Sequence, residues 1–234
     1  MFIVLEGGEG AGKSTQAGIL YNRLCQENYH ARLLREPGDT ALGEAIRTLV
    51  TSPRKTLFSG CRNSSTLNQD NSQLAAQELS SPIVPEAELL LFAAARAQMV
   101  AEQLRPFLQK GLVVVCDRYI YSTVAYQGYG AGVKLEFIYN INELVTGGLK
   151  PDLVLLLDID PVKGLERKGK VQEPSEFEAQ GLDFHRRVRQ GYLKQMGKDP
   201  HRWVKVDASL PQARVSQEIW KAVEQRLPRP EAKK

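Results

Sequence analysis

The stretch with the clearest chemical potential is a glycine-rich segment, GGEGAGKST, at positions 7–15. Its glycines let the backbone bring several N–H groups toward one point, which is what phosphate oxygens require. Lys13 can reach the outer phosphates of a nucleoside triphosphate, and the Ser14 hydroxyl can ligate Mg²⁺. A glycine-rich turn formed by chance would need neither side chain. The residues expected to bind the triphosphate are Gly7, Gly8, Glu9, Gly10, Ala11, Gly12, Lys13, Ser14 and Thr15.

Charged pairs follow two later apolar runs. Arg35 and Glu36 begin REPGDT, and Asp117 and Arg118 lie in VCDRYIYST. If these runs are parallel strands, the charged residues meet at one rim, because ligands bind at the carboxyl ends of such strands. Asp117 suits a carboxylate near Mg²⁺, with a helix N-cap as the alternative. Arg118 suits a phosphate clamp, with a surface ion pair as the alternative.

A third candidate group lies in LLLFAAARAQMV, a stretch with helical periodicity. Phe92 and Arg96 are four residues apart, so they share one helix face. An aromatic ring and a forked donor together could stack on a nucleobase and bond its edge. Taken alone, each residue has a simpler interpretation, as a core aromatic and a solvated charge. The two residues therefore indicate a nucleobase site only when they are considered together with the other motifs.

The elements that would position these residues alternate along the chain. Short runs rich in branched apolar residues predict strands at 2–6, 31–36, 112–117, 152–159 and 202–207. Helical periodicity predicts helices at 14–27, 41–51, 86–110, 135–146, 181–196 and 211–226. Strands that are apolar throughout and alternate with helices predict an α/β fold around a buried parallel sheet.

With 42% hydrophobic and 25% charged residues, the composition favours one large domain over residues 1–234, with two small domains as the alternative. A net charge of +4, without a long basic run, gives no reason to expect a nucleic-acid partner. No apolar stretch is long enough to span a membrane, and we expect no signal peptide. The sparse cysteines, Cys25, Cys61 and Cys116, favour a reducing compartment, so we expect a cytoplasmic protein.

Two segments break the alternation. Residues 52–84 are rich in Ser, Asn and Gln, and we expect a mobile surface insertion there. Residues 227–234 are expected to form a frayed tail.

The motifs together resemble the bacterial thymidylate kinase family, whose members phosphorylate dTMP to dTDP with ATP. The matching stretches run in order from residue 2 to residue 209, and they are FIVLEGGEGAGKSTQ, REPGDT, ELLLFAAARAQMV, DRYIYSTVAYQG, PDLVLLLDI and VDAS. The phosphate loop is common to many families, whereas the DRY and FAAARAQ stretches are far more specific. The resemblance implies a P-loop nucleoside monophosphate kinase fold, with a five-stranded parallel sheet flanked by helices and a mobile lid. It also implies ATP and dTMP as substrates, Mg²⁺ and a homodimer.

The resemblance also implies roles for single residues. Those matched to the dTMP site are Glu9 at the 3′-hydroxyl, Arg47 and Arg118 at the phosphate, Phe92 stacked on thymine, Arg96, Thr123 and Gln127 at the base, and Tyr126 where a ribose 2′-hydroxyl would clash. Glu36 is expected to bind the substrate too, because of its place at the rim of the sheet. Thr123 and Tyr126 could instead be packing residues. The expected catalytic residues are Lys13, Asp117, Arg118 and Arg167, and the expected metal ligands are Ser14 and Asp117.

The lid, expected within residues 164–185, departs from the arginine-rich pattern of the bacterial family. Arg167, Lys168 and Lys170 are available near its start, but a lysine cannot offer a bidentate fork. Arg167 is therefore our candidate for the lid cation. The alternatives are Arg186, Arg187 and Arg189, and each of these arginines could also be part of a solvated helix face. REPGDT departs too, because Asp39 stands where a glycine is common.

Other functions are also compatible with a phosphate loop. Another nucleoside monophosphate kinase would share the fold and the chemistry but read a different base. A nucleotide-dependent switch is a different class of protein, and it lacks support because DIDPVKG stands where a guanine-specific motif would follow the fourth strand. A kinase relic that serves as a binding scaffold is disfavoured because Lys13, Ser14, Asp117 and Arg118 are intact.

Overall fold

The computed structural model describes residues 1–51, 83–169, 177 and 180–227. Most of the predicted insertion at 52–84 and of the tail at 227–234 lies outside these residues, as do residues 170–176 and 178–179 of the predicted lid at 164–185. So do Cys61 and Lys170.

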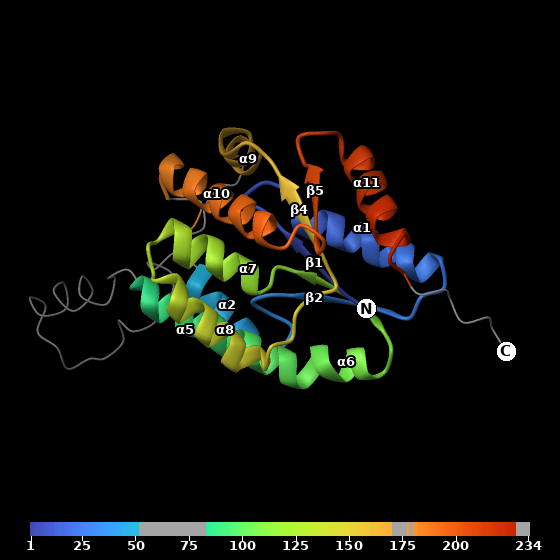
Figure 1. Cartoon of the computed structure of the whole chain (residues 1–234), viewed down its shortest axis with the longest axis horizontal. Coiled ribbons are helices and arrows are strands. Elements are labelled where there is room, and N and C mark those ends of the chain that lie inside the picture. The colour runs from blue at the N-terminus through green and yellow to red at the C-terminus, as the bar shows by residue number, and fades with distance from the viewer. Residues whose placement is uncertain (52–82, 170–176, 178–179, 228–234) are drawn as a thin grey trace, which may run out of the picture.

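A five-stranded parallel sheet forms the centre of the molecule (Figure 1). The strands are β1 (Phe2–Glu6), β2 (Ala31–Arg35), β3 (Val113–Asp117), β4 (Leu153–Asp158) and β5 (Trp203–Asp207). Their order across the sheet is β2-β3-β1-β4-β5, with Ile3 of β1 paired to Val115 on one side and Leu153 on the other. The predicted α/β architecture and all five predicted strands are confirmed.

Helices surround the sheet, joined in two places by segments of wider π-helical turn. They are α1 (Lys13–Gln26), α2 (Ala41–Thr51), α5 (Pro85–Met99), η2 (Val100–Leu104), α6 (Arg105–Gln109), α7 (Ile120–Thr123), η3 (Val124–Gly130), α8 (Leu135–Thr146), α9 (Pro161–Lys168), α10 (Leu182–Lys198) and α11 (Gln212–Glu224). Among the described helices, none is both long enough and apolar enough to cross a membrane.

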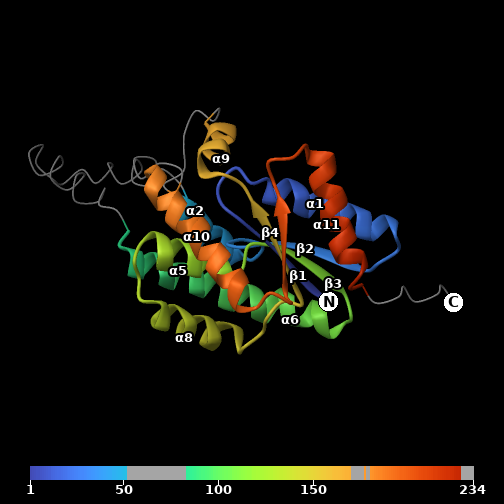
Figure 2. The ribbon, with the colours of Figure 1, turned by 45° about the horizontal axis from the view of Figure 1, so that its top comes forward.

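Side-chain alternation along the strands gives the sheet two buried faces. Ile3 and Leu5 of β1 pack with α1 and α11, which lie together on one face (Figure 2). Phe2 and Val4 point the other way and pack with the residues of α5 and η2. On that same face, η3 and α10 cover β4. Burial on both faces explains why the strands are almost wholly apolar.

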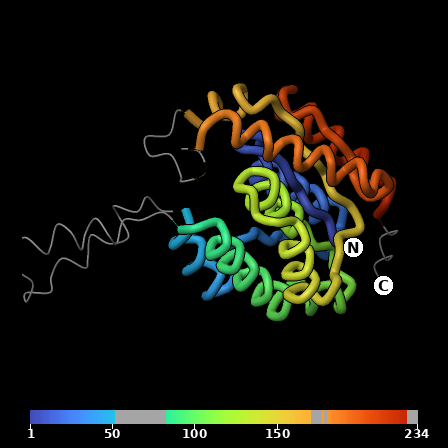
Figure 3. Tube along the Cα trace, turned by 60° about the vertical axis from the view of Figure 1, so that its left-hand side comes forward, coloured from blue at the N-terminus to red at the C-terminus, as the bar shows by residue number. Residues whose placement is uncertain are grey.

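The predicted helices are present, and α2 and α8 have the predicted limits. The predicted helix at 86–110 is present as three consecutive helical segments, in which the π-helical η2 connects α5 to α6. Figure 3 shows α2 beside the first turns of α5, and the two helices are in contact.

Two helical segments were not predicted. The stretch at 120–130 is rich in aromatic and β-branched residues and contains two glycines, so its intrinsic helix propensity is low. It is helical because it is buried against α10. Helix α9 begins at Pro161 after an N-cap at Asp160, whose carboxylate accepts a hydrogen bond from the Val162 N–H at 3.0 Å.

Candidate active site

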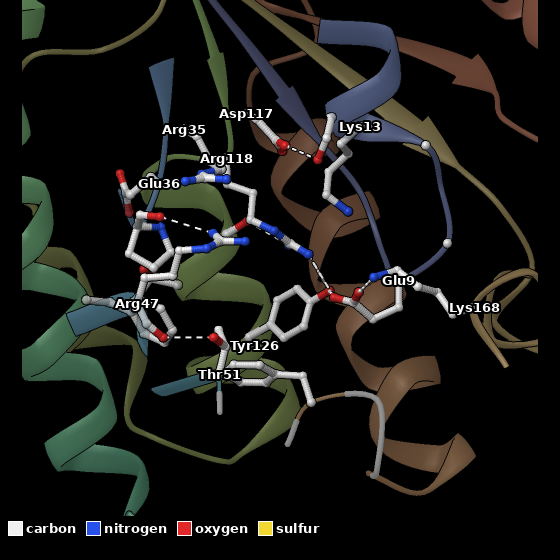
Figure 4. A pocket seen from close by; sticks show the side chains of 18 of the residues that line it. Glu9, Lys13, Arg35, Glu36, Arg47, Thr51, Asp117, Arg118, Tyr126 and Lys168 are labelled. Atoms are coloured by element: carbon white, nitrogen blue, oxygen red, sulfur yellow. Dashed lines mark hydrogen bonds and ion pairs between the residues drawn. The ribbon is translucent and has the colours of Figure 1, made fainter. Parts of the chain in front are cut away.

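A cavity of about 450 Å³ opens beside the phosphate loop, above the carboxyl ends of β1, β2 and β3. Figure 4 shows its charged lining, with the phosphate loop on one side and REPGDT on the other. The predicted site residues that line it are Glu9, Gly10, Gly12, Lys13, Ser14, Thr15, Glu36, Arg47, Phe92, Arg96, Asp117, Arg118, Thr123, Tyr126, Gln127 and Arg167. Four separate sequence motifs therefore meet in one cavity.

The phosphate loop runs from the end of β1 into α1. Gly10 has a φ of +69°, and an added Cβ there would overlap the carbonyl of Gly164 at the centre of α9. A Cβ added at Gly164 would likewise overlap the Glu9 carbonyl. These two glycines let the loop pack directly on α9. The remaining predicted loop residues, Gly7, Gly8 and Ala11, complete the chain between the strand and the helix.

Lys13 is buried at the start of α1 and donates to the Gly8 carbonyl at 2.7 Å. Burial and the neighbouring Arg118 lower the pKa of Lys13 to about 8, although Glu9 and Asp117 act in the opposite direction. The Lys13 side chain therefore folds over the phosphate loop. A bound anion would compete with the Gly8 carbonyl for its ammonium group.

Ser14 and Asp117 form a short contact across the base of the cavity, with the serine hydroxyl 2.5 Å from the carboxylate. The other carboxylate oxygen, Oδ1, is buried and has no hydrogen-bond partner among the described residues. A hydroxyl beside a carboxylate with an unsatisfied oxygen fits a hard cation such as Mg²⁺. The described residues contain no group of three ionisable or thiol ligands that could hold a metal, so such a cation would also need phosphate or water oxygens. Asp117 ends β3 and is no helix cap, since the N-cap of α7 is Tyr119.

Arg118, Glu9 and Tyr126 form a bonded triad on the cavity wall (Figure 4). Arg118 donates to the Glu9 carboxylate at 2.7 Å, and so does the Tyr126 hydroxyl. Burial raises the pKa of Glu9, but the nearby charges of Arg118, Lys13 and Lys168 outweigh it and lower that pKa to about 2. Glu9 is therefore ionised at any physiological pH. Arg118 therefore forms its ion pair with Glu9 inside the cavity and not on the protein surface.

Arg96 is only 1% exposed, so it is not a solvated charge. Its Nε donates to Glu36 at 3.0 Å, and its Nη2 donates to the other oxygen of the same carboxylate. Further bonds run to Thr123 at 2.7 Å and to Asn142 at 2.5 Å. A guanidinium has five N–H donors. One Nη1–H is thus left without a partner among the described residues, in a side chain that lines the cavity.

Gln127 lies in η3, where the wider turn is marked by a bond from Ala131 N to Tyr126 O at 2.8 Å. Its amide nitrogen donates to Glu88 of α5 at 2.6 Å. A carboxylate only accepts, so this contact fixes which end of the amide is the NH₂ group. The carbonyl end of Gln127 is then available to a ligand in the cavity.

Aromatic rings line the far end of the cavity. Phe92 is partly exposed there and lies 6.1 Å from the ring of Phe177, at a tilt of 39°. Phe177 also meets Tyr126 edge-on, with 5.6 Å between the ring centroids. Phe92 is thus both part of a hydrophobic cluster and a wall of the cavity, so the core and stacking interpretations are compatible.

REPGDT forms the wall opposite the phosphate loop. Arg47 of α2 reaches back to it and donates to the Pro37 carbonyl at 3.1 Å. Asp39 has a φ of +60°, which explains why a glycine would suit this position, and its carboxylate accepts a hydrogen bond from the Arg35 N–H. Asp39 therefore lacks the conformational freedom of glycine, but its carboxylate forms a hydrogen bond that closes the loop.

The candidates for a lid cation are separated by the structure. Arg167 lines the cavity and donates to the carbonyls of Ala208 at 2.7 Å and Ser209 at 3.2 Å. Lys168 also lines it, with its ammonium 3.8 Å from Glu9. The three alternatives on α10 bond elsewhere and do not line the cavity; they are Arg186 with Asp183, Arg187 with the Gly130 carbonyl and Arg189 with Asp158.

Sequence reasoning missed several residues that belong to this site. Asn142 of α8 holds Arg96, and Ser122 contacts Arg118 at 3.2 Å. Phe177 supplies an aromatic wall from the lid segment. Ser122 lies within the DRY motif and could have been found there. Asn142 and Phe177 carry no local pattern that separates them from ordinary helix or lid residues.

The chain matches the family model described as thymidylate kinase over residues 5–63 and 64–219. A thymidylate kinase of Synechococcus sp. is 44% identical over 228 residues, covering 97% of this chain and 96% of that protein. The thymidylate kinase of Deinococcus radiodurans is 41% identical, covering 97% of each.

Among solved structures, the crystal structure of thymidylate kinase from Ehrlichia chaffeensis superposes with a TM-score of 0.68 at 30% identity. The match covers 95% of this chain and 98% of that one. Together with the family model and the relatives, this match establishes that the chain belongs to the thymidylate kinase family.

Proposed function

We propose that this protein transfers the γ-phosphate of ATP to dTMP, forming dTDP and ADP. The observation that carries the proposal is that the phosphate loop, Phe92, Arg96 and Gln127 all line one cavity. The distribution of charge fits two anionic substrates, because Lys13 lies at the loop and Arg118 lies between the loop and that wall.

The base wall favours thymine over other bases. The remaining Nη1–H of Arg96 suits the O4 carbonyl of thymine, and the Gln127 carbonyl suits a base N–H such as N3–H. Cytosine presents an amino group and a bare nitrogen at these two positions, so each contact would become a clash of like groups. Phe92 provides a ring on which the base can stack. Tyr126, whose hydroxyl donates to Glu9, lies on the side expected to hold the ribose.

A general base is not required for this transfer. A phosphate monoester has a second pKa near 6, so dTMP is already mostly a dianion at neutral pH. The obstacle is repulsion between two polyanions and the charge that develops on the bridging oxygen. Lys13, Arg118 and Arg47 can hold the acceptor and the donor close together and neutralise that charge, with Arg167 as the candidate from the lid side. Arg167 would first have to leave its carbonyl partners.

Mg²⁺, when bound, would supply a positive charge that offsets the negative charge of the ATP phosphates. Ser14 and Asp117 would hold it, as their geometry at the base of the cavity allows.

We further propose one kinase domain that works as a cytoplasmic homodimer. Helices α2 and α5 are neighbours, and they leave Leu42, Leu49 and Leu90 exposed. A second copy would cover such leucines, as the resemblance to bacterial thymidylate kinases implies. Light scattering of the purified protein tests this, and a monomer at micromolar concentration would contradict it.

The activity itself is tested by ADP release with ATP and a panel of acceptors, namely dTMP, dUMP, dCMP, AMP and GMP. We expect dTMP to give the largest kcat/KM. ADP release that does not depend on any acceptor would favour a nucleotide switch, and a preference for AMP or GMP would favour another monophosphate kinase.

A further inference from the structure

Glu6, the last residue of β1, is a buried acid to which the chemistry above assigns no role. Its side chain is 0% exposed and does not line the cavity. An ionisable group without solvent is costly unless it is fully hydrogen-bonded. Glu6 directly precedes the phosphate loop, and its carboxylate points under the DRY segment.

Both oxygens of Glu6 are saturated by donors from two distant parts of the chain. Oε1 accepts from the backbone N–H groups of Tyr119 at 2.9 Å and Ser122 at 3.2 Å. Oε2 accepts from the Ser122 hydroxyl at 2.6 Å and the Tyr192 hydroxyl at 3.1 Å. Four hydrogen bonds thus tie β1 to the start of α7 and to α10.

The bonds to Oε1 are those of a helix N-cap, made by a different strand. Tyr119 is the N-cap residue of α7, and no side chain of the helix itself caps it. Glu6 accepts from the N–H of the N-cap residue and from the N–H of the third helical residue, Ser122, which also donates to the Tyr119 carbonyl at 3.1 Å. Glu6 therefore supports the first turn of the short α7.

That turn sets the position of Arg118. Arg118 has a φ of +74°, a conformation that costs energy for an arginine and persists only where neighbours impose it. Its guanidinium contacts the Ser122 hydroxyl at 3.2 Å, and this hydroxyl is the one bonded to Glu6. A chain of contacts thus leads from Glu6 through Ser122 to Arg118.

We propose that Glu6 is a positioning residue for phosphate transfer, which holds Arg118 in its reactive place by capping α7 and orienting Ser122. The inference rests on the proposed function, because it takes Arg118 as a phosphate contact. Glu6 touches no substrate. Tyr192 extends the same network to α10, the helix that follows the lid segment, since its hydroxyl also lies 2.9 Å from that of Ser122.

The test compares Glu6→Gln with the wild type in dTMP-dependent ADP release, with Glu136→Gln on the exposed start of α8 as the matched control. Glutamine keeps one acceptor for the backbone N–H groups but replaces the oxygen that orients Ser122. We expect kcat to fall at least about 10-fold while KM for ATP stays within about 2-fold, because a small misplacement of a catalytic group is costly. The control variant is expected to match the wild type.

A double-mutant cycle in the Arg118→Ala background separates positioning from general damage. If Glu6 acts through Arg118, adding Glu6→Gln to Arg118→Ala lowers kcat by less than about 2-fold. Equal losses in both backgrounds, or a Glu6→Gln enzyme with normal kcat, would overturn the inference. If Glu6→Gln does not fold, Ser122→Ala takes its place in the same cycle with the same expectations. A wild type without dTMP-dependent turnover would instead overturn the proposed function, and the inference with it.

Discussion

The Arg118 guanidinium lies 2.7 Å from the Glu9 carboxylate, so the residue that follows β3 is paired with the middle of the phosphate loop. The pair stands where the two substrates would meet. Because the pKa of Glu9 is lowered to about 2, the pair remains ionised at working pH. Arg118 is therefore held ready on the cavity wall before any phosphate arrives.

Replacement of Arg118 by lysine should reduce turnover strongly. Lysine keeps the charge, but its donors share one nitrogen and lack the planar fork by which Arg118 contacts Glu9 and Ser122 and can reach a phosphate. We expect Arg118→Lys to lower kcat with dTMP by about 100-fold, the scale of losing one preorganised contact to developing charge. Arg214→Lys, on the exposed face of α11, is the control. Near-normal rates for Arg118→Lys would remove Arg118 from the phosphate clamp.

Arg96 combines a structural and a recognition role, and two variants can separate them. Arg96→Ala leaves the Glu36 carboxylate buried without its cation, which costs about 3–5 kcal/mol of folding free energy. Adding Glu36→Gln removes that uncompensated charge, so the double variant should recover part of the lost thermal stability. It should not recover use of dTMP. Calorimetry and acceptor kinetics measure the two effects, and equal loss of ATP and dTMP binding would argue against base reading.

Glu88 should control selectivity through the amide of Gln127. In Glu88→Gln the new side chain can donate as well as accept, so the Gln127 amide can turn over and present its NH₂ group to the base. We expect the ratio of kcat/KM for dTMP to that for dCMP to fall about 10-fold. Glu86→Gln, on the exposed side of the same helix, is the control. An unchanged ratio would show that Gln127 does not read the base.

The burial of Glu6 predicts a pH-dependent stability. Burial raises the pKa of Glu6 from 4.5 to about 7, against the opposing influence of Arg118 and its hydrogen-bond donors. Between these two pH values the folded protein binds one more proton than the unfolded chain, so the free energy of unfolding falls as pH rises, by up to about 1.4 kcal/mol per unit. The other titratable groups that interact with Glu6 are Lys13, Cys116, Tyr121 and Tyr192, and they keep their protons in this window. Denaturant titrations at several pH values give the free energy of unfolding of the wild type and of Glu6→Gln. If this free energy depends on pH in the same way in both proteins, the raised pKa of Glu6 is contradicted.

Much of the fold could be predicted from sequence because its signals are local. Strands buried on both faces read as continuous apolar runs, and α2 and α8 show helical periodicity with clear ends. The stretch at 120–130 could not be found in this way. Its helix depends on a cap from Glu6 and on burial against α10, and neither is visible in the residues of the stretch itself.

The candidate site follows the same division. The phosphate loop and the DRY motif could be placed at one rim because carboxyl ends of parallel strands lie together. The partners of Arg96 could not be assigned, because Glu36, Thr123 and Asn142 come from three different elements whose meeting depends on tertiary packing. The effect of Asp39 could not be predicted either, because it depends on the positive φ of this residue and on its bond to the Arg35 N–H.

The central claim is that dTMP and ATP are held head to tail in the cavity between Phe92 and Lys13. The most direct measurement is a crystal structure of this protein with dTMP bound. We predict the thymine ring against Phe92 with its O4 at Arg96, and the phosphate at Arg118 and Arg47. A dTMP molecule bound elsewhere, with the wall around Phe92 empty, would contradict the account.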